Sequence, residues 1–566
     1  MMNWDRSVDF LVVGSGAAGM TAALRAHDLG GETLIVEKAP VFGGNTALSG
    51  GVVWVPNNPL MKAAGISDSE TEALQYLERV TAGSSTTAKL RRYIEAGPRM
   101  MSELAESSHV RFECVTEYPD YYPEEPGGKQ GGRSCEPAIF DALELGEEID
   151  RMRLPDKTHY VLGGRLTVQV ADGKVLMGGG IRVLWFLLRC LVRYYSNFRA
   201  RIRGLPNTDF TLGGAVIGRL RRSLMDRDVP LWLETRLLDL VVEQDRVVGA
   251  IVEKDGKSLH IQARKGVLLA AGGFERNLEM REKYQPSPAS DRWTAGVETN
   301  TGDTVALALK VGAGLDLMDE AWWCPSIRVP YADPVRILIF EKSLPGGLIV
   351  DRLGHRFMNE AEPYNDAGKS MYRANVPDGT AIPAHLVFDS VFRKKYPMGP
   401  MSPGSSTPDW ALPKALRSDF FVKSDTLEGL ANAIGVDADG LVATVREFNE
   451  FARAGKDPDF GRGDSAQDRY YTSRAEGPNP SLGLIEEAPF YAVKVYPGDL
   501  GTKGGVRTDI DARALTDKEE VVHGLYAAGN CSASAMGRTY PGAGGTIGPA
   551  MTFGYLAAEH ACGKAD

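Results

Sequence analysis

A glycine-rich segment near the start of the chain, residues 14–19 (GSGAAG), has the composition and spacing to bind a pyrophosphate. Residues 9–13 (DFLVV) predict a buried strand before it, and residues 20–29 predict a helix after it. In such a turn the backbone can approach the pyrophosphate closely, and the helix N-terminus supplies free N–H groups. A second predicted strand, residues 33–36, ends in Glu37, 18 residues after the last of these glycines, where an acid can bind a ribose hydroxyl. The pattern predicts a dinucleotide site.

Three further segments favour FAD over NAD as the dinucleotide. Residues 42–51 (FGGNTALSGG) combine glycines with small hydroxyl residues, which permit close backbone approach to a bulky ligand. Residues 266–273 and 524–530 each predict an apolar strand that runs into glycines. Together with residues 14–19, these segments resemble the succinate dehydrogenase and fumarate reductase type of flavoprotein, in which the last glycine turn lies near the flavin. No second GxGxxG motif follows a strand, so no permanent NADPH site is predicted.

The composition argues against several other classes of protein. With 43% apolar and 24% charged residues, the chain is typical of globular proteins. Its net charge of −10 argues against a nucleic-acid partner. The cysteines are scattered without a CxxC pair, so we expect reduced thiols and no metal site. Neither a signal peptide nor an uncharged apolar run of about 18 residues is present, and we therefore expect a cytoplasmic protein.

The positions of these segments predict the fold class and the domains. We expect an α/β protein in which a Rossmann-like FAD-binding domain carries an inserted α+β catalytic domain. Residues 1–318 and 487–566 are predicted to form the FAD-binding domain, and residues 319–486 the catalytic domain. Within the first of these ranges, residues 150–212 are predicted to be an insertion.

The sequence resembles the 3-ketosteroid Δ1-dehydrogenases over nearly its whole length, apart from the insertion. The segments that carry this resemblance are 42–44 (FGG), 119–122 (PDYY), 359–360 (NE) with 363–364 (PY), 499–505 (DLGTKGG) and 537–544 (GRTYPGAG). The resemblance implies an FAD-dependent 3-oxosteroid 1-dehydrogenase. Such an enzyme desaturates the C1–C2 bond of a 3-ketosteroid such as androst-4-ene-3,17-dione and passes the electrons to an external acceptor.

The same resemblance implies roles for individual residues. Tyr540, through its hydroxyl, and Gly544, through its backbone N–H, would polarise the C3 carbonyl of the steroid. Tyr364 would remove the proton from C2, while the hydride from C1 would pass to FAD N5. Tyr121 would donate a hydrogen bond to Tyr364 and favour its phenolate, although the adjacent Tyr122 could be the assisting group instead.

The glycine motifs and the resemblance together predict the residues that hold FAD. They are Gly14, Ser15, Gly16, Ala17, Ala18, Gly19, Glu37, Lys38, Gly43, Gly44, Asn45, Thr46, Ser49, Gly50, Gly51, Ala271, Gly272, Asn300, Asp303, Gly529, Asn530 and Gly545. Cys531 follows the last glycine turn, but its serine-rich neighbourhood predicts a turn and not a flavin link. We therefore expect FAD to be bound without a covalent bond.

Other functions remain as alternatives on the same fold. In 3-ketosteroid Δ4-(5α)-dehydrogenases a serine lies two residues after the C-terminal catalytic tyrosine, whereas this chain has Gly542 there. A fumarate reductase needs convergent Arg and His to hold two carboxylates, and here Arg538 has no accompanying His. A flavin-binding or membrane-tethered carrier without enzymatic activity is a further alternative.

Residues 181–203 within the insertion predict a membrane-binding helix. This segment contains Trp185, four leucines and several arginines, and it has no acidic residue. Apolar side chains can enter the headgroup region while arginines meet anionic lipid, although the apolar run is too short to span a bilayer. We expect peripheral contact with the inner face of the cell membrane. A helix that covers a domain or forms an oligomer interface is the alternative.

Overall fold

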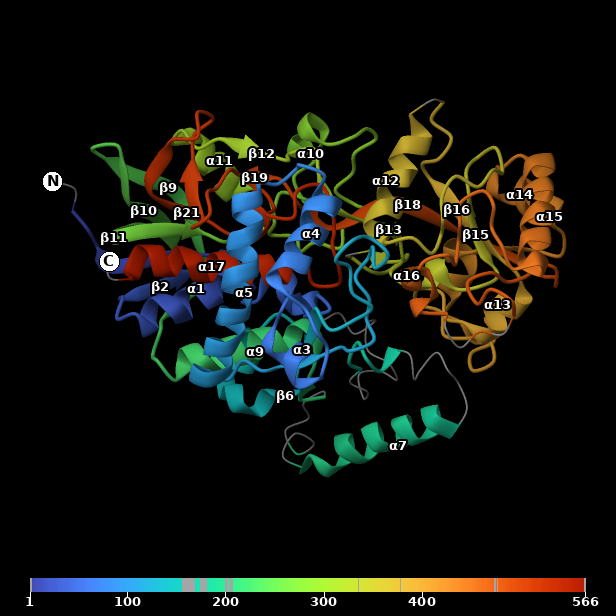
Figure 1. The fold of residues 1–566 in the computed structure, drawn as a ribbon, viewed down its shortest axis with the longest axis horizontal. Helices are drawn as coiled ribbons and strands as arrows, with labels where there is room; N and C mark the ends of the chain where they lie inside the picture. The colour runs from blue at the N-terminus through green and yellow to red at the C-terminus, as the bar shows by residue number, and fades with distance from the viewer. Residues whose placement is uncertain are drawn as a thin grey trace.

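The computed structural model shows two parts that lie side by side (Figure 1). The described residues are 3–154, 168–173, 181–198, 202, 207–333, 335–376, 378–472, 475 and 477–563. Both ends of the chain lie in one part, and residues coloured yellow to orange in Figure 1 build the other. The sheets and helices of both parts confirm the predicted α/β class.

The part that contains both chain ends is built on an eight-stranded sheet in the order β20-β21-β10-β11-β1-β2-β8, with β9 paired to β10. Its strands are β1 (Arg6–Val13), β2 (Thr33–Val36), β8 (Leu231–Trp232), β9 (Thr235–Glu243), β10 (Arg246–Lys254), β11 (Lys257–Leu269), β20 (Arg513–Leu515) and β21 (Val521–Ala527). The segments predicted as strands form β1, β2, the end of β11, and β21, which run parallel to one another. Their carboxyl ends therefore meet at one edge of the sheet, and the glycine turns that follow them converge there.

Helices cover both faces of this sheet. One face is covered by α-helices and one 3₁₀ helix, some of which pack on the sheet and some behind the first layer. They are α1 (Ala17–Asp28), α2 (Gly44–Leu48), α3 (Pro59–Ala63), α4 (Glu70–Thr81), α5 (Thr87–Ser107), η1 (Ala142–Arg151), α9 (Leu212–Met225) and α17 (Ile547–Cys562). On the opposite face lies α11 (Asp303–Lys310), with α10 (Leu278–Tyr284) nearby. Alternate residues of β1 enter the two cores, Phe10 and Val12 on one side and Leu11 and Val13 on the other.

The other part is built on a six-stranded sheet in the order β14-β13-β18-β16-β15, with β17 paired to β18. Its strands are β13 (Ala321–Ile327), β14 (Arg336–Ile337), β15 (Gly347–Val350), β16 (Ala384–Phe388), β17 (Val422–Ser424) and β18 (Phe490–Thr502). Helix α12 (Tyr364–Asn375) packs on one face, and α14 (Leu427–Ile434) and α15 (Ala438–Ala454) pack on the other. Strand β18 starts at the predicted return to the FAD-binding domain, yet it pairs within this second sheet.

Short elements complete the description of both parts. The remaining strands are β3 (Val53–Trp54), β4 (Phe112–Cys114), β5 (Ser134–Pro137), β6 (Phe140–Asp141), β7 (Asp209–Phe210), β12 (Leu315–Asp316) and β19 (Gly505–Val506). The remaining helical turns are η3 (Glu341–Ser343), α13 (Ser390–Lys395), η4 (Asp409–Ala411), η5 (Leu416–Phe420), α16 (Ala466–Tyr470) and η6 (Gly529–Cys531). None of the six cysteines is bonded to another in the structure.

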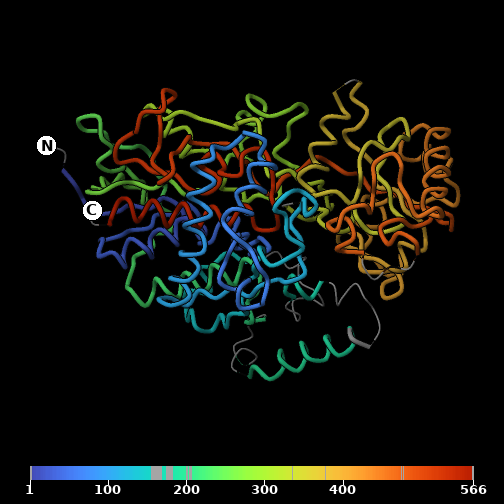
Figure 2. The backbone as a smooth tube through the Cα atoms, in the orientation of Figure 1, coloured from blue at the N-terminus to red at the C-terminus, as the bar shows by residue number. Residues whose placement is uncertain are grey.

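Helix α7 (Ile181–Ser196) stands apart from both parts, and Figure 2 shows it as a separate green coil. It falls within the segment 181–203 that the sequence singles out; positions 199–201 and 203 of that segment are not among the described residues. Large apolar side chains of α7 are exposed, with Leu184 66% and Trp185 65% accessible to solvent. No helix in the described part of the chain has the length and apolar character needed to cross a membrane.

A buried ion pair joins the two parts. Arg281 of α10 and Asp499 of β18 lie 2.7 Å apart, and both side chains are 0% exposed. Thr294 donates a second hydrogen bond to the Asp499 carboxylate over 2.6 Å. Burial alone would favour neutral forms of both groups, and each charge is therefore stabilised mainly by the other.

We expect Arg281→Met to destabilise the folded holoenzyme by about 3–5 kcal/mol, because it leaves the Asp499 carboxylate buried without a counter-charge. Thermal unfolding of the purified protein would measure this. Adding Asp499→Asn to Arg281→Met should restore part of the loss. The matched control is Arg264→Met, since Arg264 makes an exposed ion pair with Asp9 and should matter by at most about 1 kcal/mol. Equal effects of the two arginine substitutions would contradict this prediction.

Candidate active site

The glycine-rich turn after β1 has the shape that a bound pyrophosphate requires. Gly14 has a φ of 111°, and a Cβ there would stand 2.3 Å from the carbonyl oxygen of Ala270. A Cβ on Gly19 would stand 2.1 Å from the carbonyl oxygen of Gly14. In front of Gly16, by contrast, the nearest protein atom to such a Cβ is Thr46 Oγ1 at 3.6 Å. Two glycines therefore allow the backbone to pack, and the third leaves open space in which a ligand fits.

Glu37 lies beside this turn at the end of β2. Its Oε2 accepts hydrogen bonds from the backbone N–H and the hydroxyl of Ser15, at 3.0 and 2.7 Å. The neighbouring Lys38 donates to Thr301 over 2.7 Å and to Asp303 over 3.1 Å. The structure thus places the Glu37 carboxylate where a ribose could meet it, and Lys38 and Asp303 bind each other.

The other predicted cofactor segments meet at the same edge of the sheet. Ala17 N–H donates to Thr46 Oγ1 over 3.2 Å, which joins the turn to α2. Gly529 follows β21 with a φ of 73°, and a Cβ there would lie 3.4 Å from that of Ala18. Asn530 accepts a hydrogen bond from Trp322 Nε1 over 3.1 Å. Segments from the beginning, the middle and the end of the chain therefore lie next to one another.

Glu275 is a site residue that the sequence reasoning missed. Its Oε1 accepts hydrogen bonds from Asn45 Nδ2 at 2.8 Å and from Asn300 Nδ2 at 2.7 Å. The side chain is 0% exposed, and burial raises the pKa of its carboxyl. The sequence did contain a signal for Glu275, because this residue follows β11 and its glycines in the same way as Glu37 follows β2. Glu275 connects two predicted cofactor asparagines that are 255 residues apart in the sequence.

Three predicted catalytic tyrosines, Tyr121, Tyr364 and Tyr540, form a compact triangle. Ring centroids lie 5.4 Å apart for Tyr121 and Tyr364, 5.3 Å for Tyr121 and Tyr540, and 5.4 Å for Tyr364 and Tyr540. All three residues are buried, and Trp322 packs 4.8 Å from Tyr540. The rings come from the loop after β4, from the first residue of α12 and from the loop before α17. Residues separated by more than 400 positions therefore share one enclosed space.

Hydrogen-bond donors surround the hydroxyl of Tyr540. Thr546 donates its hydroxyl to the Tyr540 oxygen over 3.1 Å. Burial raises the pKa of Tyr540, while Thr546, Tyr364 and the backbone N–H of Gly544 act to lower it. Gly544 has a φ of 97°, and a Cβ there would stand 2.6 Å from the carbonyl oxygen of Val52. The Tyr540 hydroxyl and the Gly544 N–H thus lie near one point.

Tyr364 has a more apolar environment. Burial raises its pKa well above the ordinary value of a tyrosine, and the nearby Tyr121 hydroxyl acts to lower it. In the described part of the chain the Tyr121 hydroxyl has no hydrogen-bond partner of normal geometry, so it remains available as a donor. Tyr122 instead donates to Asp366 over 2.9 Å. Its hydroxyl is therefore engaged away from Tyr364, and the geometry favours Tyr121 as the assisting group.

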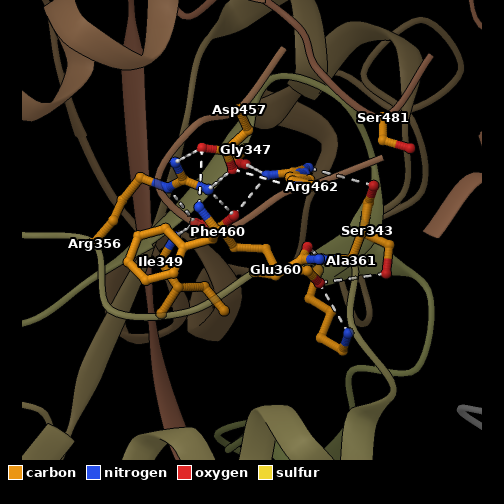
Figure 3. A network of polar contacts seen from close by, with 12 residues as sticks. Ser343, Gly347, Ile349, Arg356, Glu360, Ala361, Asp457, Phe460, Arg462 and Ser481 are labelled. Atoms are coloured by element: carbon orange, nitrogen blue, oxygen red, sulfur yellow. Dashed lines mark hydrogen bonds and ion pairs between the residues drawn. The ribbon is translucent and has the colours of Figure 1, made fainter. Parts of the chain in front are cut away.

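A buried ionic network fixes the segment that leads into Tyr364 (Figure 3). The Glu360 carboxylate accepts from Arg356 at 2.8 Å, from Arg462 at 3.0 Å and from the Ile349 N–H at 3.1 Å. Burial would raise the pKa of Glu360, but the two arginines lower it to about 2. Lys342 donates to the carbonyl oxygen of Glu360 over 2.8 Å. Helix α12 begins four residues after Glu360, so this network limits where the Tyr364 ring can lie.

Aromatic residues extend the site beyond the triangle. Tyr118 and Tyr471 share a hydrogen bond of 2.7 Å between their hydroxyls, and Phe340 lies 6.0 Å from Tyr471. The sequence motifs did not single out Tyr118 and Tyr471, because these two residues lie in distant parts of the chain. Trp323, next in sequence to Trp322, packs on Tyr372 on the other side of β13 and does not join the site. The described residues contain no group of side chains that could hold a metal ion.

Comparison with known proteins identifies the family. A family model described as an FAD binding domain matches residues 9–547. A 3-oxosteroid 1-dehydrogenase of Mycolicibacterium smegmatis is 44% identical, over 97% of this chain and 96% of its own. The chain belongs to the 3-oxosteroid 1-dehydrogenase family. This result confirms the resemblance read from the motifs and confirms FAD as the cofactor.

A solved structure supports this assignment, and a more distant relative has a different name. The crystal structure of the 3-ketosteroid Δ1-dehydrogenase from Sterolibacterium denitrificans, in complex with 1,4-androstadiene-3,17-dione, has a TM-score of 0.95 and 44% identity. It covers 98% of this chain, which in turn covers 99% of it. A 4-oxocyclohexanecarboxylate 2-dehydrogenase of Sinomonas cyclohexanicum is 34% identical over 98% of this chain and 93% of its own.

We expect Gly16→Ala to weaken FAD binding by about tenfold or more, because the added methyl group enters the space in front of the turn. Titration of the apoprotein with FAD, followed by flavin fluorescence, would measure the affinity. Gly214→Ala is the matched control, since a Cβ there meets only the Phe210 side chain at 3.8 Å. Unchanged FAD affinity in Gly16→Ala would show that the pyrophosphate binds elsewhere.

Proposed function

We propose that this flavoenzyme converts 3-ketosteroids to their 1-ene derivatives, as the names of its relatives state for those proteins. The observation that carries this proposal is the buried triangle of tyrosines beside the Gly544 N–H. A reaction that removes hydrogen from two adjacent ring carbons needs donors for a carbonyl oxygen and a base for a neighbouring proton. The triangle can supply both from its own side chains.

The C3 carbonyl would lie against Tyr540 and Gly544. The Tyr540 hydroxyl and the Gly544 N–H would each donate a hydrogen bond to the carbonyl oxygen. Negative charge develops on this oxygen as the C2 proton leaves, and preorganised donors in a site without water stabilise that charge. Glycine suits position 544, because a side chain would collide with the backbone at Val52.

Tyr364 would accept the C2 proton. A phenol is a weak base at neutral pH, and burial makes its ionisation harder still. A hydrogen bond from Tyr121 favours the phenolate, and Tyr121 has a free hydroxyl with which to donate it. The ring of Tyr121 lies edge-on to that of Tyr364, so the assisting group is held next to the base.

Bound FAD would take up the hydride from C1 at its N5, and an external acceptor would complete the turnover. The residues proposed to hold it are those of the glycine turns, together with Glu37, Asn45, Asn300 and Asn530. The Cys531 thiol is buried and points at the carbonyl oxygen of Leu269, 2.9 Å away. This orientation supports binding without a covalent link.

The alternatives have weaker support. Reduction of a dicarboxylate would need a free arginine near Tyr540, but Arg538 pairs with Asp319 at 2.7 Å and with Glu320 at 3.0 Å. A serine two residues after Tyr540 would favour Δ4 chemistry, and Gly542 is present instead. The relative named 4-oxocyclohexanecarboxylate 2-dehydrogenase is likewise named for dehydrogenation of a ring that carries a ketone. A ketone beside a CH–CH bond is therefore the feature we expect every substrate to have.

We expect Tyr364→Phe and Tyr540→Phe each to lower turnover of androst-4-ene-3,17-dione by about two orders of magnitude or more while FAD stays bound. The first removes the base and the second a donor to the developing oxyanion. Exchange of the C2 proton with deuterated water should separate them, with the greater loss in Tyr364→Phe. Tyr396→Phe is the matched control, because Tyr396 packs in a core away from the triangle.

Turnover should also rise with pH between about pH 6 and pH 10, because Tyr364 acts as its phenolate and burial places its pKa above that range. Steady-state kinetics at saturating acceptor would record the profile. A flat profile, or near wild-type rates in both phenylalanine variants, would remove Tyr364 and Tyr540 from these roles.

We further propose that α7 binds the surface of an anionic membrane. Its exposed apolar side chains include Leu184, Trp185 and Val192, and Arg193 lies on the same helix. Arg193 also pairs with Asp209 over 2.5 Å, which connects the helix to β7. Steroids partition into bilayers, so a site near the membrane would gain access to its substrate.

The protein should sediment with vesicles of phosphatidylcholine and phosphatidylserine at low salt and be released at high salt, because anionic headgroups attract the arginines. Trp185→Glu with Phe186→Glu should abolish sedimentation. Trp410→Glu is the matched control, since Trp410 is 78% exposed on a different part of the surface. Absence of wild-type binding at low salt, or equal loss in the control, would leave α7 as a packing or assembly element.

A further inference from the structure

A cavity of about 660 Å³ opens on the part of the molecule that carries the six-stranded sheet. Its floor is formed by β16 and β18, from which His385, Lys494 and Tyr496 line it. Its walls include Val422 of β17 and Ile434 at the end of α14. None of its lining residues belongs to the tyrosine triangle or to the glycine turns. The volume falls in the range of small-molecule sites, about 300–1,000 Å³.

The imidazole of His385 is buried and makes no hydrogen bond within the described part of the chain. It is 5% exposed, and in the described part of the chain neither of its ring nitrogens has a hydrogen-bond partner. Burial and the positive charge of Lys494, which lies opposite His385 on the neighbouring strand β18, lower the pKa of His385 to about 4. The ring is therefore neutral at neutral pH. A neutral imidazole carries one N–H donor, and leaving a buried donor without an acceptor costs free energy. Such a group in the floor of a cavity indicates an acceptor that a ligand would supply.

The charges around the cavity indicate the sign of that ligand. Its basic side chains are Arg276, Arg292, Arg328 and Lys494, and its acidic side chains are Asp333 and Asp419. Asp333 is paired with Arg276 at 2.9 Å, so the remaining lining charges are mainly positive. A ligand with negative charge would therefore be attracted.

Apolar residues occupy the space between the floor and these charges. They include Val335, Phe420, Phe421, Val422 and Ile434. A small inorganic anion would leave these surfaces in contact with water, whereas a ligand with an apolar body would cover them. The cavity therefore has the character of a site for an amphipathic molecule.

We propose that this cavity binds an amphipathic carboxylate, separately from the steroid and from FAD. The carboxylate accepts a hydrogen bond from His385 and meets the Lys494 ammonium, and one flat carboxylate has the two oxygens needed to contact both. The apolar body lies along Phe421, Val422 and Ile434. The inference does not depend on the proposed steroid chemistry, because no tyrosine of the triangle takes part.

Calorimetric titration of the holoenzyme with laurate, below its micelle concentration, tests this proposal. We expect one laurate per chain and the same affinity when 1,4-androstadiene-3,17-dione is present in excess. Dodecanol and dodecyltrimethylammonium have the same apolar chain with a neutral or positive head, and both should bind at least about tenfold more weakly. Displacement of laurate by the steroid, or equal binding of the three probes, would overturn the proposal.

Two variants locate the binding. Lys494→Met removes the charge but keeps an apolar stem, and His385→Phe removes the donor but keeps a ring. Each should weaken laurate binding by about tenfold or more. Lys257→Met is the matched control, because Lys257 is an exposed lysine on β11 of the other sheet. If His385→Phe fails to fold, the Lys494→Met variant alone tests the proposal, because Lys494 is exposed. Unchanged laurate affinity in Lys494→Met would refute the assignment.

Discussion

A phenol loses its proton less readily when water is excluded from around it, and the tyrosines of this site are buried against one another. Burial raises the pKa of Tyr121, Tyr364 and Tyr540, with Tyr364 well above its ordinary value. The same exclusion of water strengthens each hydrogen bond that reaches the site. The protein must therefore bury all three tyrosine hydroxyls and still place hydrogen-bond donors next to the oxygens that need them. Most of the architecture around them meets this requirement.

Buried acids, each held by several hydrogen bonds, lie behind the aromatic residues of the site. Glu360 holds the approach to Tyr364 through two arginines, and Glu275 holds the cofactor asparagines through one carboxylate. Both acids are 0% exposed and fully engaged. Removing a partner from such a group is costly, whereas an exposed ion pair contributes little. The positions of the proposed catalytic and cofactor-binding side chains are thus stabilised by buried acids that lie behind them.

The parts of this arrangement that the sequence could predict are those encoded locally. A strand, a glycine turn and an acid in register predicted the first cofactor segment, and motif resemblance selected the tyrosines. Glu275 was missed because its partners, Asn45 and Asn300, are distant in the chain, and no spacing rule connects them. Strand β18 illustrates the same limit. Its apolar sequence is compatible with either sheet, and only pairing with β13 and β16 places it.

The pairing of β18 with β13 limits how the two parts can move relative to each other. The chain crosses between the two parts along β13 and β18, which run antiparallel, with Ala321 opposite Thr502 and Trp323 opposite Asp499. Because both crossings belong to one hydrogen-bonded ribbon, the parts cannot slide apart without breaking it. Torsion of that ribbon would leave its hydrogen bonds intact. Trp322, located on it and packed against Tyr540, would turn with the ribbon, so a twist between the two parts would first change the surroundings of Tyr540.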